Sequence, residues 1–249
     1  MTNRKRIAKA SILALLTLAG CSGDGPERRA AGTPGLSVAD AALAGGMPET
    51  ALSVTEAILK ANPRDAGALA RRAEALARMN DPEGAMAAWR QVLAVDSRSP
   101  AALLGMGRFA LSRGDAVAAE QAFSKLLSVA PEDQAAMNNL GVALDMLGRH
   151  AEAQEVYGKL LRLSRDHRAA RVNLGLSLSL SGKAGESVAM LRGAASQPGA
   201  TPRVRQDLAL ALVLSGNTQE AEKLLRTDLS APDAAAAVAG YRALAPMKP

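Results

Sequence analysis

Small and large apolar residues recur along the chain every 34 residues, without insertion or deletion, in five units that begin at Ala66. In each unit, position 8 is Ala or Gly, position 20 is Ala or Ser, and position 15 is Gly or Asn. Position 24 is always large: Trp89, Phe123, Tyr157, Leu191 and Leu225. Small residues let two helices approach closely, a large residue fills the gap to the next helix, and glycine ends a helix before a tight turn. The pattern predicts a pair of helices in each unit.

The two ends of the array depart from this pattern. One unit further back, residues 32–65 match weakly, with Gly45-Gly46 and with Thr55 where a large residue is expected. After the last unit, residues 233–245 read as a short helix whose Tyr241 and Leu244 cover the end of the stack, as a solenoid needs. We therefore predict an all-α solenoid of about six helix-turn-helix units over 36–235, then a capping helix and tail over 236–249.

The composition supports helices over sheets. Hydrophobic residues make up 48% of the chain but aromatic residues only 2%, so Ala, Leu, Val and Met fill the core. Sandwiches and barrels depend on β-branched and aromatic residues, whereas Ala and Leu favour helices.

The first twenty residues have the features of a secretion signal. Arg4, Lys5, Arg6 and Lys9 precede an apolar run over 10–19, which is too short to span a bilayer and suits a signal peptide. The run ends in Leu18-Ala19-Gly20-Cys21, with the only cysteine of the chain, and this resembles the bacterial lipobox.

The lipobox resemblance implies cleavage of residues 1–20 and a diacylglycerol and an N-acyl chain on Cys21. The residue after the cysteine is Ser22 and not Asp, which by resemblance to enterobacterial lipoproteins implies the periplasmic face of the outer membrane rather than the inner membrane. Residues 21–35 read as the lipidated cysteine and a flexible linker, because they are rich in Gly, Pro and charge. An ordinary signal peptide with a coincidental cysteine is the alternative.

The leader also changes the meaning of the net charge. The whole chain has a formal charge of +6, which suggests nucleic acid or a membrane surface as a partner. Four of the 30 basic residues and none of the 24 acidic ones lie in the leader, so the rest of the chain carries only +2. We therefore expect no nucleic-acid partner.

The 34-residue unit resembles the tetratricopeptide repeat, over residues 32–235. In that family, the first helix of each unit lines a concave groove that binds proteins. The resemblance implies a partner-binding groove formed by Leu104, Arg108, Asn138, Asn139, Val142, Asp145, Val172, Asn173, Leu176 and Gln206. Apolar groove residues are typical of a trough for a peptide or helix. The alternative is that they pack against one another in a tight superhelix.

Catalytic and metal-binding patterns are missing from the sequence. His150 and His167 have no Cys, Ser or carboxylate at the spacing of a triad or metal site, and we expect both to be plain surface residues. The sequence predicts neither an enzyme nor a metal site, and no cofactor or small-molecule substrate.

A narrower resemblance rests on four stretches and the lipobox. The stretches are NNLGVALDMLGRHAE from Asn138, VNLGLSLSLSG from Val172, TPRVRQDLALALVLSG from Thr201 and AAAAVAGYRAL near the end. They resemble the TadD family, the tetratricopeptide lipoproteins of tight-adherence (Flp) pilus assembly. This implies a scaffold for a type IVb pilus secretion system, with the outer-membrane secretin or another assembly component as its partner. The alternatives are a pilotin-like or cell-wall-associated lipoprotein of another envelope complex, and a regulatory subunit of a peptidoglycan enzyme.

Overall fold

The computed structural model describes residues 34–243, and these residues form only helices and the turns between them. The predicted signal peptide, Cys21, most of the predicted linker and Leu244 lie outside the described residues. The helices are α1 (Pro34–Ala44), α2 (Pro48–Ala61), α3 (Ala66–Arg78), α4 (Pro82–Val95), α5 (Pro100–Ser112), α6 (Ala116–Val129), α7 (Gln134–Met146), α8 (His150–Leu163), α9 (Arg168–Leu180), α10 (Ala184–Ala195), α11 (Pro202–Leu214), α12 (Thr218–Leu225) and α13 (Ala231–Ala243). The predicted all-α solenoid is confirmed.

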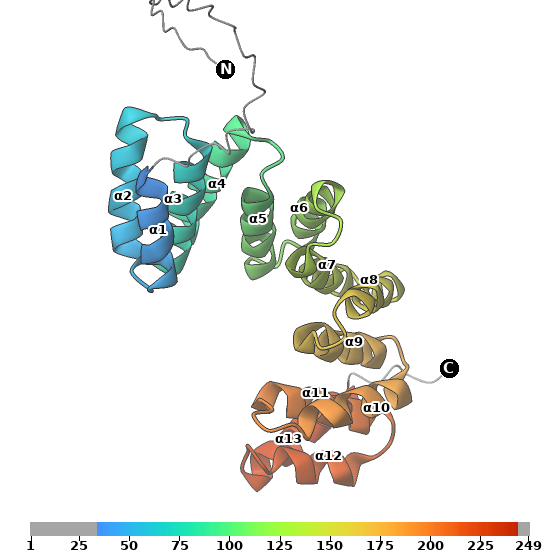
Figure 1. The fold of residues 1–249 in the computed structure, drawn as a ribbon. Coiled ribbons are helices and arrows are strands. Elements are labelled where there is room, and N and C mark those ends of the chain that lie inside the picture. The colour runs from blue at the N-terminus through green and yellow to red at the C-terminus, as the bar shows by residue number, and fades with distance from the viewer. Residues whose placement is uncertain (1–33, 244–249) are drawn as a thin grey trace, which may run out of the picture.

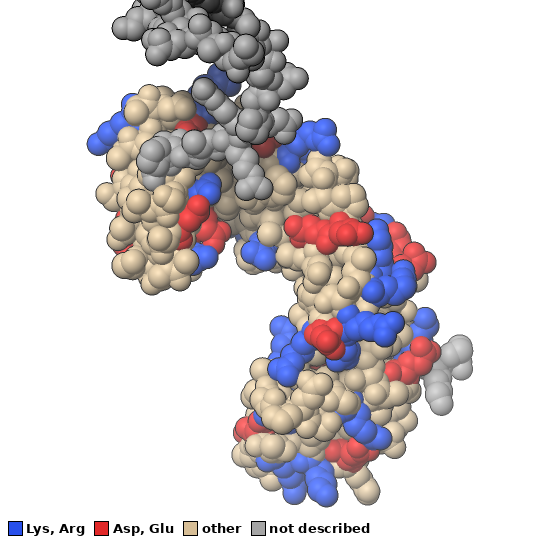
Figure 2. Space-filling view, in the orientation of Figure 1, with Lys and Arg blue, Asp and Glu red and all other residues tan. Residues whose placement is uncertain are grey.

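The helices form six pairs that stack in chain order along a curve, and α13 follows the last pair (Figure 1). The curve is open on one side, between the block of α1–α4 and the block of α10–α13 (Figure 1). On the face that Figure 2 shows, basic and acidic side chains lie interspersed among neutral ones where the described residues are visible. No helix within residues 34–243 is long and apolar enough to cross a membrane.

Contacts between position 8 and position 24 hold the two helices of a unit together. A Cβ on Gly141 in α7 would lie 2.4 Å from Tyr157 Cε1 in α8, and a Cβ on Gly107 would lie 2.5 Å from Phe123 Cε1. Tyr157 and Phe123 are fully buried. The small residue therefore leaves the space that the large side chain occupies, as the repeat pattern predicts.

Short polar side chains and glycines set where the helices begin and end. Asp65, Asp81, Asp115 and Asp133 each accept a hydrogen bond from the backbone N–H three residues on, which caps α3, α4, α6 and α7. Position 15 takes a left-handed conformation in every unit, with Gly in all but the second, where Asn80 has φ of 59°. These signals explain why helices of similar length recur with one period.

The two ends differ in detail from their predicted form. The weakly matching first unit forms a full helix pair, α1 and α2, and α1 begins at Pro34, just before the predicted boundary. Thr55 is fully buried there, and its hydroxyl donates to the Leu52 carbonyl at 2.8 Å, so the buried polar group is satisfied. At the other end, α13 begins at Ala231, earlier than 236, because Ser230 bonds the carboxylate and backbone N–H of Asp233 and so starts the helix.

Helix α13 covers the last pair of the solenoid. Ala234 and Val238 are buried against the cluster that α11 and α12 form, and Tyr241 packs partly buried against the same cluster. The predicted role of Tyr241 agrees with this contact.

Candidate partner-binding groove

Two adjoining hollows lie on helices α7, α9 and α11, the first helices of the last three pairs. The larger hollow has a volume of about 580 Å³ and is lined by Val142, Arg168, Ala169, Val172, Asn173, Ala194, Ala200, Thr201, Arg203 and Val204. The smaller hollow, of about 260 Å³, is lined by Val142, Asp145, Met146, Tyr157, Asn173, Leu176, Leu180 and Arg203. Because Val142, Asn173 and Arg203 line both, the two hollows form one continuous groove.

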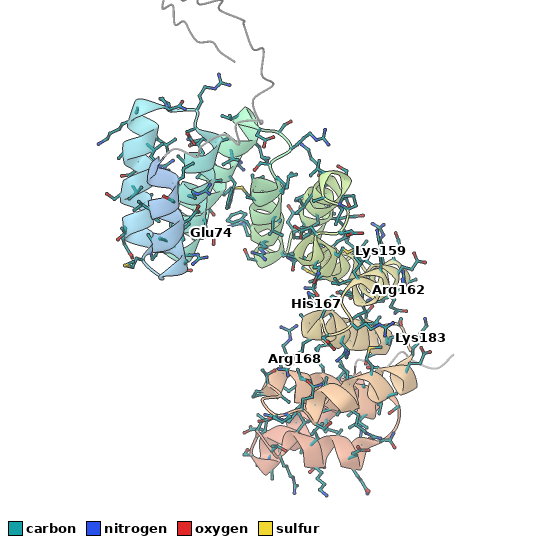
Figure 3. All side chains as sticks on the ribbon, viewed as in Figure 1. Glu74, Lys159, Arg162, His167, Arg168 and Lys183 are labelled. Carbon is teal, nitrogen blue, oxygen red and sulfur yellow. The ribbon has the colours of Figure 1, made fainter. Side chains whose placement is uncertain are left out.

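The groove faces the open side of the curve. In Figure 3, Arg168 extends from the start of α9 toward that side, whereas Lys159, Arg162 and Lys183 lie on the opposite side in this view. Val142 of α7, Val172 of α9 and Val204 of α11 line one surface, although they stand at positions 9, 5 and 3 of their units.

Half of the ten predicted groove residues line these two hollows: Val142, Asp145, Val172, Asn173 and Leu176. Asn138 lies beside them, because Asn173 Nδ2 donates to Asn138 Oδ1 at 3.0 Å. This bond links α7 to α9 beside the groove. The two Asn side chains thus bond each other, whereas the family resemblance implies that they contact a partner.

The other four predicted residues lie elsewhere. Arg108 lines a separate hollow of about 230 Å³ between α3, α4 and α5, with Glu74 and Trp89. Leu104 packs partly buried against the cluster of α5, α6 and α7. Asn139 and Gln206 are half-buried and line neither hollow of the groove. The structure therefore brings half of the predicted set together in the groove, with Asn138 beside it, and places the other four residues elsewhere.

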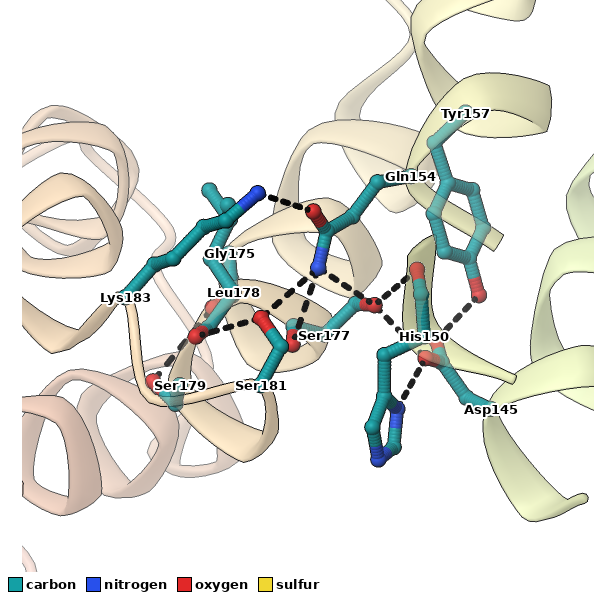
Figure 4. A network of polar contacts seen from close by, with 10 residues as sticks. All are labelled: Asp145, His150, Gln154, Tyr157, Gly175, Ser177, Leu178, Ser179, Ser181 and Lys183. Atoms are coloured by element: carbon teal, nitrogen blue, oxygen red, sulfur yellow. Dashed lines mark hydrogen bonds and ion pairs between the residues drawn. The ribbon is translucent and has the colours of Figure 1, made fainter. Parts of the chain in front are cut away.

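Asp145 is an intramolecular acceptor at the end of the smaller hollow (Figure 4). Its carboxylate accepts from the Ser177 hydroxyl at 2.6 Å and from the Tyr157 hydroxyl at 3.2 Å, and it lies 2.9 Å from His150 Nδ1. Its side chain is only 14% exposed. The carboxylate thus joins α7, α8 and α9, and little of it faces a partner.

Burial raises the pKa of Tyr157 far above its ordinary value, and the negative charge of Asp145 adds to this effect. The phenol therefore stays protonated and donates to Asp145.

The two histidines are structural residues, and our expectation of plain surface histidines is wrong. His150 pairs with Asp145, and its side chain is 23% exposed. His167 Nδ1 accepts from the backbone N–H of Ala170 at 3.1 Å and so caps α9. Both use the ring as a local hydrogen-bonding group, which a search for catalytic spacings does not detect.

Polar contacts continue from Asp145 into the fifth pair (Figure 4). Gln154 Nε2 donates to the Ser181 hydroxyl at 2.8 Å, and Lys183 Nζ donates to Gln154 Oε1 at 3.0 Å. Deeper in, the Ser179 hydroxyl donates to Ser187 Oγ, which donates to the Gly175 carbonyl at 2.6 Å. The hydroxyls of Ser179 and Ser187 are buried but satisfied, so they specify how α9 and α10 align.

Sequence reasoning missed the charged and the most exposed apolar residues of the groove. Arg168 and Arg203 line the larger hollow, and Met146 and Leu180 in the smaller one are 48% and 46% exposed. Arg203 stands at position 2 of its unit, and Met146 and Leu180 stand at position 13 of theirs. Those positions belong to the groove in this type of repeat, so listing them would have found three of the four.

Asp207 is a half-buried carboxylate on α11, next to this groove. Its Oδ2 atom is buried without a hydrogen-bond partner among the described residues. Burial raises the pKa of Asp207, while the charge of Arg203 opposes the shift. Asp207 in turn helps to raise the pKa of Tyr241 on α13, behind the larger effect of burial.

A curved stack of helix pairs with a groove on the first helices of the pairs defines a helical-repeat scaffold of the kind that binds proteins. Two models of the tetratricopeptide repeat match the sequence, one over residues 38–88 and the other over 78–144 and 110–174. Together they cover more than half of the chain, which belongs to the tetratricopeptide repeat proteins. Comparison with curated protein sequences gives no match.

Several solved structures share this fold. PilW, described as a widely conserved type IV pilus biogenesis factor, is 20% identical with a TM-score of 0.68, covering 78% of this chain and 91% of PilW. Pseudomonas aeruginosa PilF is 21% identical with a TM-score of 0.66, covering 78% of this chain and 89% of PilF. YrrB, described as a tetratricopeptide protein with an unusual peptide-binding site, is 20% identical with a TM-score of 0.58, covering 76% and 94%. At these identities the likeness establishes the fold.

Proposed function

We propose that this chain is a lipid-anchored scaffold on the periplasmic face of the outer membrane, where it assists assembly of a tight-adherence (type IVb, Flp) pilus secretion system. The observation that carries the proposal is a combination. The chain shares its solenoid fold with PilW, a type IV pilus biogenesis factor, and its leader ends in a lipobox-like Leu18-Ala19-Gly20-Cys21. The TadD-like stretches from Asn138 onward narrow the proposal to the tight-adherence system.

The scaffold acts by holding a partner rather than by chemistry. A lipid on Cys21 keeps the chain at the membrane, because each buried CH₂ adds about 0.8 kcal/mol and several acyl chains together give lasting attachment. The groove over α7, α9 and α11 binds a segment of the secretin or of a neighbouring assembly component. Both attachments together raise the local concentration of the partner at the site of assembly.

Deletion of the gene tests the pilus assignment. We expect the deletion strain to lose Flp pili and surface adhesion, and the wild-type chain supplied in trans to restore both. A pull-down from detergent-solubilised envelope should recover the tight-adherence secretin or its neighbours. Normal pili in the deletion strain would refute the assignment. Recovery of another secretin, or of a cell-wall enzyme, would favour the pilotin-like or the peptidoglycan-related alternative.

The lipid anchor has its own test. Cys21→Ala removes the only thiol that can carry the diacylglycerol. We expect this variant to incorporate no labelled palmitate, to keep its leader and to be absent from the outer-membrane fraction. Ser22→Ala is the matched control, and it should be lipidated normally. If the Cys21→Ala protein reaches the outer membrane as the wild type does, the anchor is not a lipid on this residue.

A further inference from the structure

The larger hollow of the groove is apolar on its walls and basic at its edge. Its walls include Val142, Val172 and Val204. Its two charged residues are Arg168 and Arg203, and no carboxylate lines it. A surface of this composition matches a ligand that has aliphatic groups and a negative charge side by side.

The two arginines lack acidic partners. Arg168 Nη2 donates to the neutral amide oxygen of Gln197 at 3.0 Å. Arg203 makes no hydrogen bond or ion pair within residues 34–243, although its charge reaches Asp207. By contrast, Arg205 on the same helix is held by Asp228. No carboxylate therefore neutralises Arg168 or Arg203 by contact, and of the basic residues without such a partner these two line the larger hollow.

Their place on the helices makes the site more positive. Arg168 is the first residue of α9 and Arg203 the second of α11, and neither helix has an acidic residue in its first turn. A helix N-terminus carries a partial positive charge, so an arginine there is unfavourable for the helix alone. The caps differ in the same direction, because carboxylates of Asp65 and Asp133 cap α3 and α7, whereas a ring nitrogen of His167 and the hydroxyl of Thr201 cap α9 and α11.

The two carboxylates near the groove, Asp145 and Asp207, do not form ion pairs with Arg168 or Arg203 in place of a partner's carboxylate. Asp145, at the far end of the smaller hollow, is engaged by Ser177, Tyr157 and His150. Asp207 forms no ion pair, and its Oδ2 is buried away from solvent.

We propose that this groove takes a segment of a partner protein in which an acidic side chain stands beside aliphatic ones, with the carboxylate between Arg168 and Arg203. The proposal rests on the proposed function as a protein-binding scaffold and gives the partner its chemistry. The aliphatic side chains fill the larger hollow and continue over Met146 and Leu180 in the smaller one. This continuous apolar surface favours a protein segment over a small anion, which would leave it uncovered.

A peptide selection tests this chemistry without knowledge of the partner. Full-length protein in detergent is exposed to a phage library of short random peptides, and peptides that also bind the Arg168→Gln/Arg203→Gln variant are removed. We expect the remaining peptides to share an Asp or Glu next to Leu, Ile or Val. Binding of the best peptide should weaken about tenfold or more when its acid is replaced by the amide or when Arg203 is replaced by Gln, because a charge-assisted hydrogen bond is lost.

Arg90→Gln, an exposed arginine on α4 away from the groove, is the control and should bind as the wild type does. Peptides without an acidic preference, or equal binding by the double variant, would overturn the proposal. So would a double variant that loses only its attachment to vesicles of phosphatidylglycerol, since the arginines would then serve a lipid surface. A second copy of the chain, seen as a dimer that the double variant abolishes, would overturn it as well.

The in-cell result separates this proposal from the pilus assignment. If deletion abolishes pili but the double variant restores them fully, the acidic-partner proposal fails and the pilus assignment stands. If deletion leaves pili intact while the selected peptides are acidic and depend on both arginines, the pilus assignment fails and the acidic-partner proposal stands.

Discussion

Replacing Gly141 with alanine should destabilise the protein, although alanine is the better helix former. Gly141 lies in α7, against the ring of Tyr157 in α8. A Cβ there would lie 2.4 Å from Tyr157 Cε1 and 2.5 Å from Cζ, so the ring has to move. The ring is fully buried and its hydroxyl donates to Asp145, which leaves it little freedom to do so.

The expected loss of stability is the sum of one stabilising and two destabilising effects. Alanine improves helix propensity by about 1 kcal/mol. Overpacking a tight core costs about 1–3 kcal/mol. Moving the ring also weakens the hydrogen bond to Asp145, and a bond to a charged group contributes about 1.5–3 kcal/mol. We expect a net loss of about 2–4 kcal/mol in the free energy of unfolding.

Gly158 provides a matched control, since it follows Tyr157 in the middle of α8. A Cβ on Gly158 would meet only Arg162 Nη1, at the ordinary contact distance of 3.6 Å. Gly158→Ala should therefore stabilise the protein by up to about 1 kcal/mol. The same substitution in neighbouring helices then has opposite signs.

Urea unfolding of the full-length chain, followed by far-ultraviolet circular dichroism, measures both variants. The sixth unit has Ala209 and Leu225 at the positions of Gly141 and Tyr157, so Gly141→Ala should cost less when combined with Tyr157→Leu. We expect a coupling energy of about 1 kcal/mol or more between the two sites. If Gly141→Ala unfolds at the wild-type urea concentration while Gly158→Ala behaves as expected, close helix contact does not explain the glycine.

Three further predictions concern polar and turn residues. Asp145→Ala removes the acceptor shared by Ser177 and Tyr157 and should lower the free energy of unfolding by about 3 kcal/mol. The control Glu120→Ala, which breaks an exposed ion pair with Arg149, should cost less than about 1 kcal/mol. Equal losses in urea unfolding would contradict a stabilising role of the Asp145 hydrogen bonds. Asp207→Asn should raise the melting temperature at neutral pH, because burial makes the charged carboxylate of Asp207 unfavourable and raises its pKa. The folded chain therefore holds this proton more tightly than the unfolded chain does. The wild-type protein gains stability as the pH falls from the raised pKa toward the ordinary value of 3.8. Melting curves across this window should show that gain in the wild type and not in the variant, and an unchanged pH dependence would remove Asp207 as its source. Gly148→Ala should destabilise by about 1–2 kcal/mol because φ is 73° there, and Asn80→Gly, at φ of 59°, should be neutral or stabilising; a destabilising Asn80→Gly in the same urea assay would show that the Asn side chain is needed.

The fold was predictable because its main contacts repeat within one unit. Gly141 and Tyr157 are 16 residues apart, and the same pair of positions recurs as Gly107 with Phe123. Because the same pair of positions recurs in each unit, one sequence without homologues is enough to predict the contact between the two helices.

The groove was only partly predictable because it depends on how units curve relative to one another. Val142 and Val172 stand at expected positions, but Arg203 reaches the same hollow from two units further on. The bond between Asn138 and Asn173, and the three partners of Asp145, likewise depend on side-chain directions across neighbouring helices. A periodic pattern gives the face of each helix, whereas these contacts follow from the stacking angle.

The order of the helices along the curve also separates two tasks in space. Helix α1, the described element nearest to Cys21 in the sequence, lies at one end of the stack, and the groove over α7, α9 and α11 lies toward the other (Figure 1). With a lipid at Cys21, the intervening helix pairs act as an arm that presents the groove at a distance from the bilayer. Adding or removing whole units between α3 and α6 would then change the reach of the arm and leave the recognition chemistry at its tip unchanged.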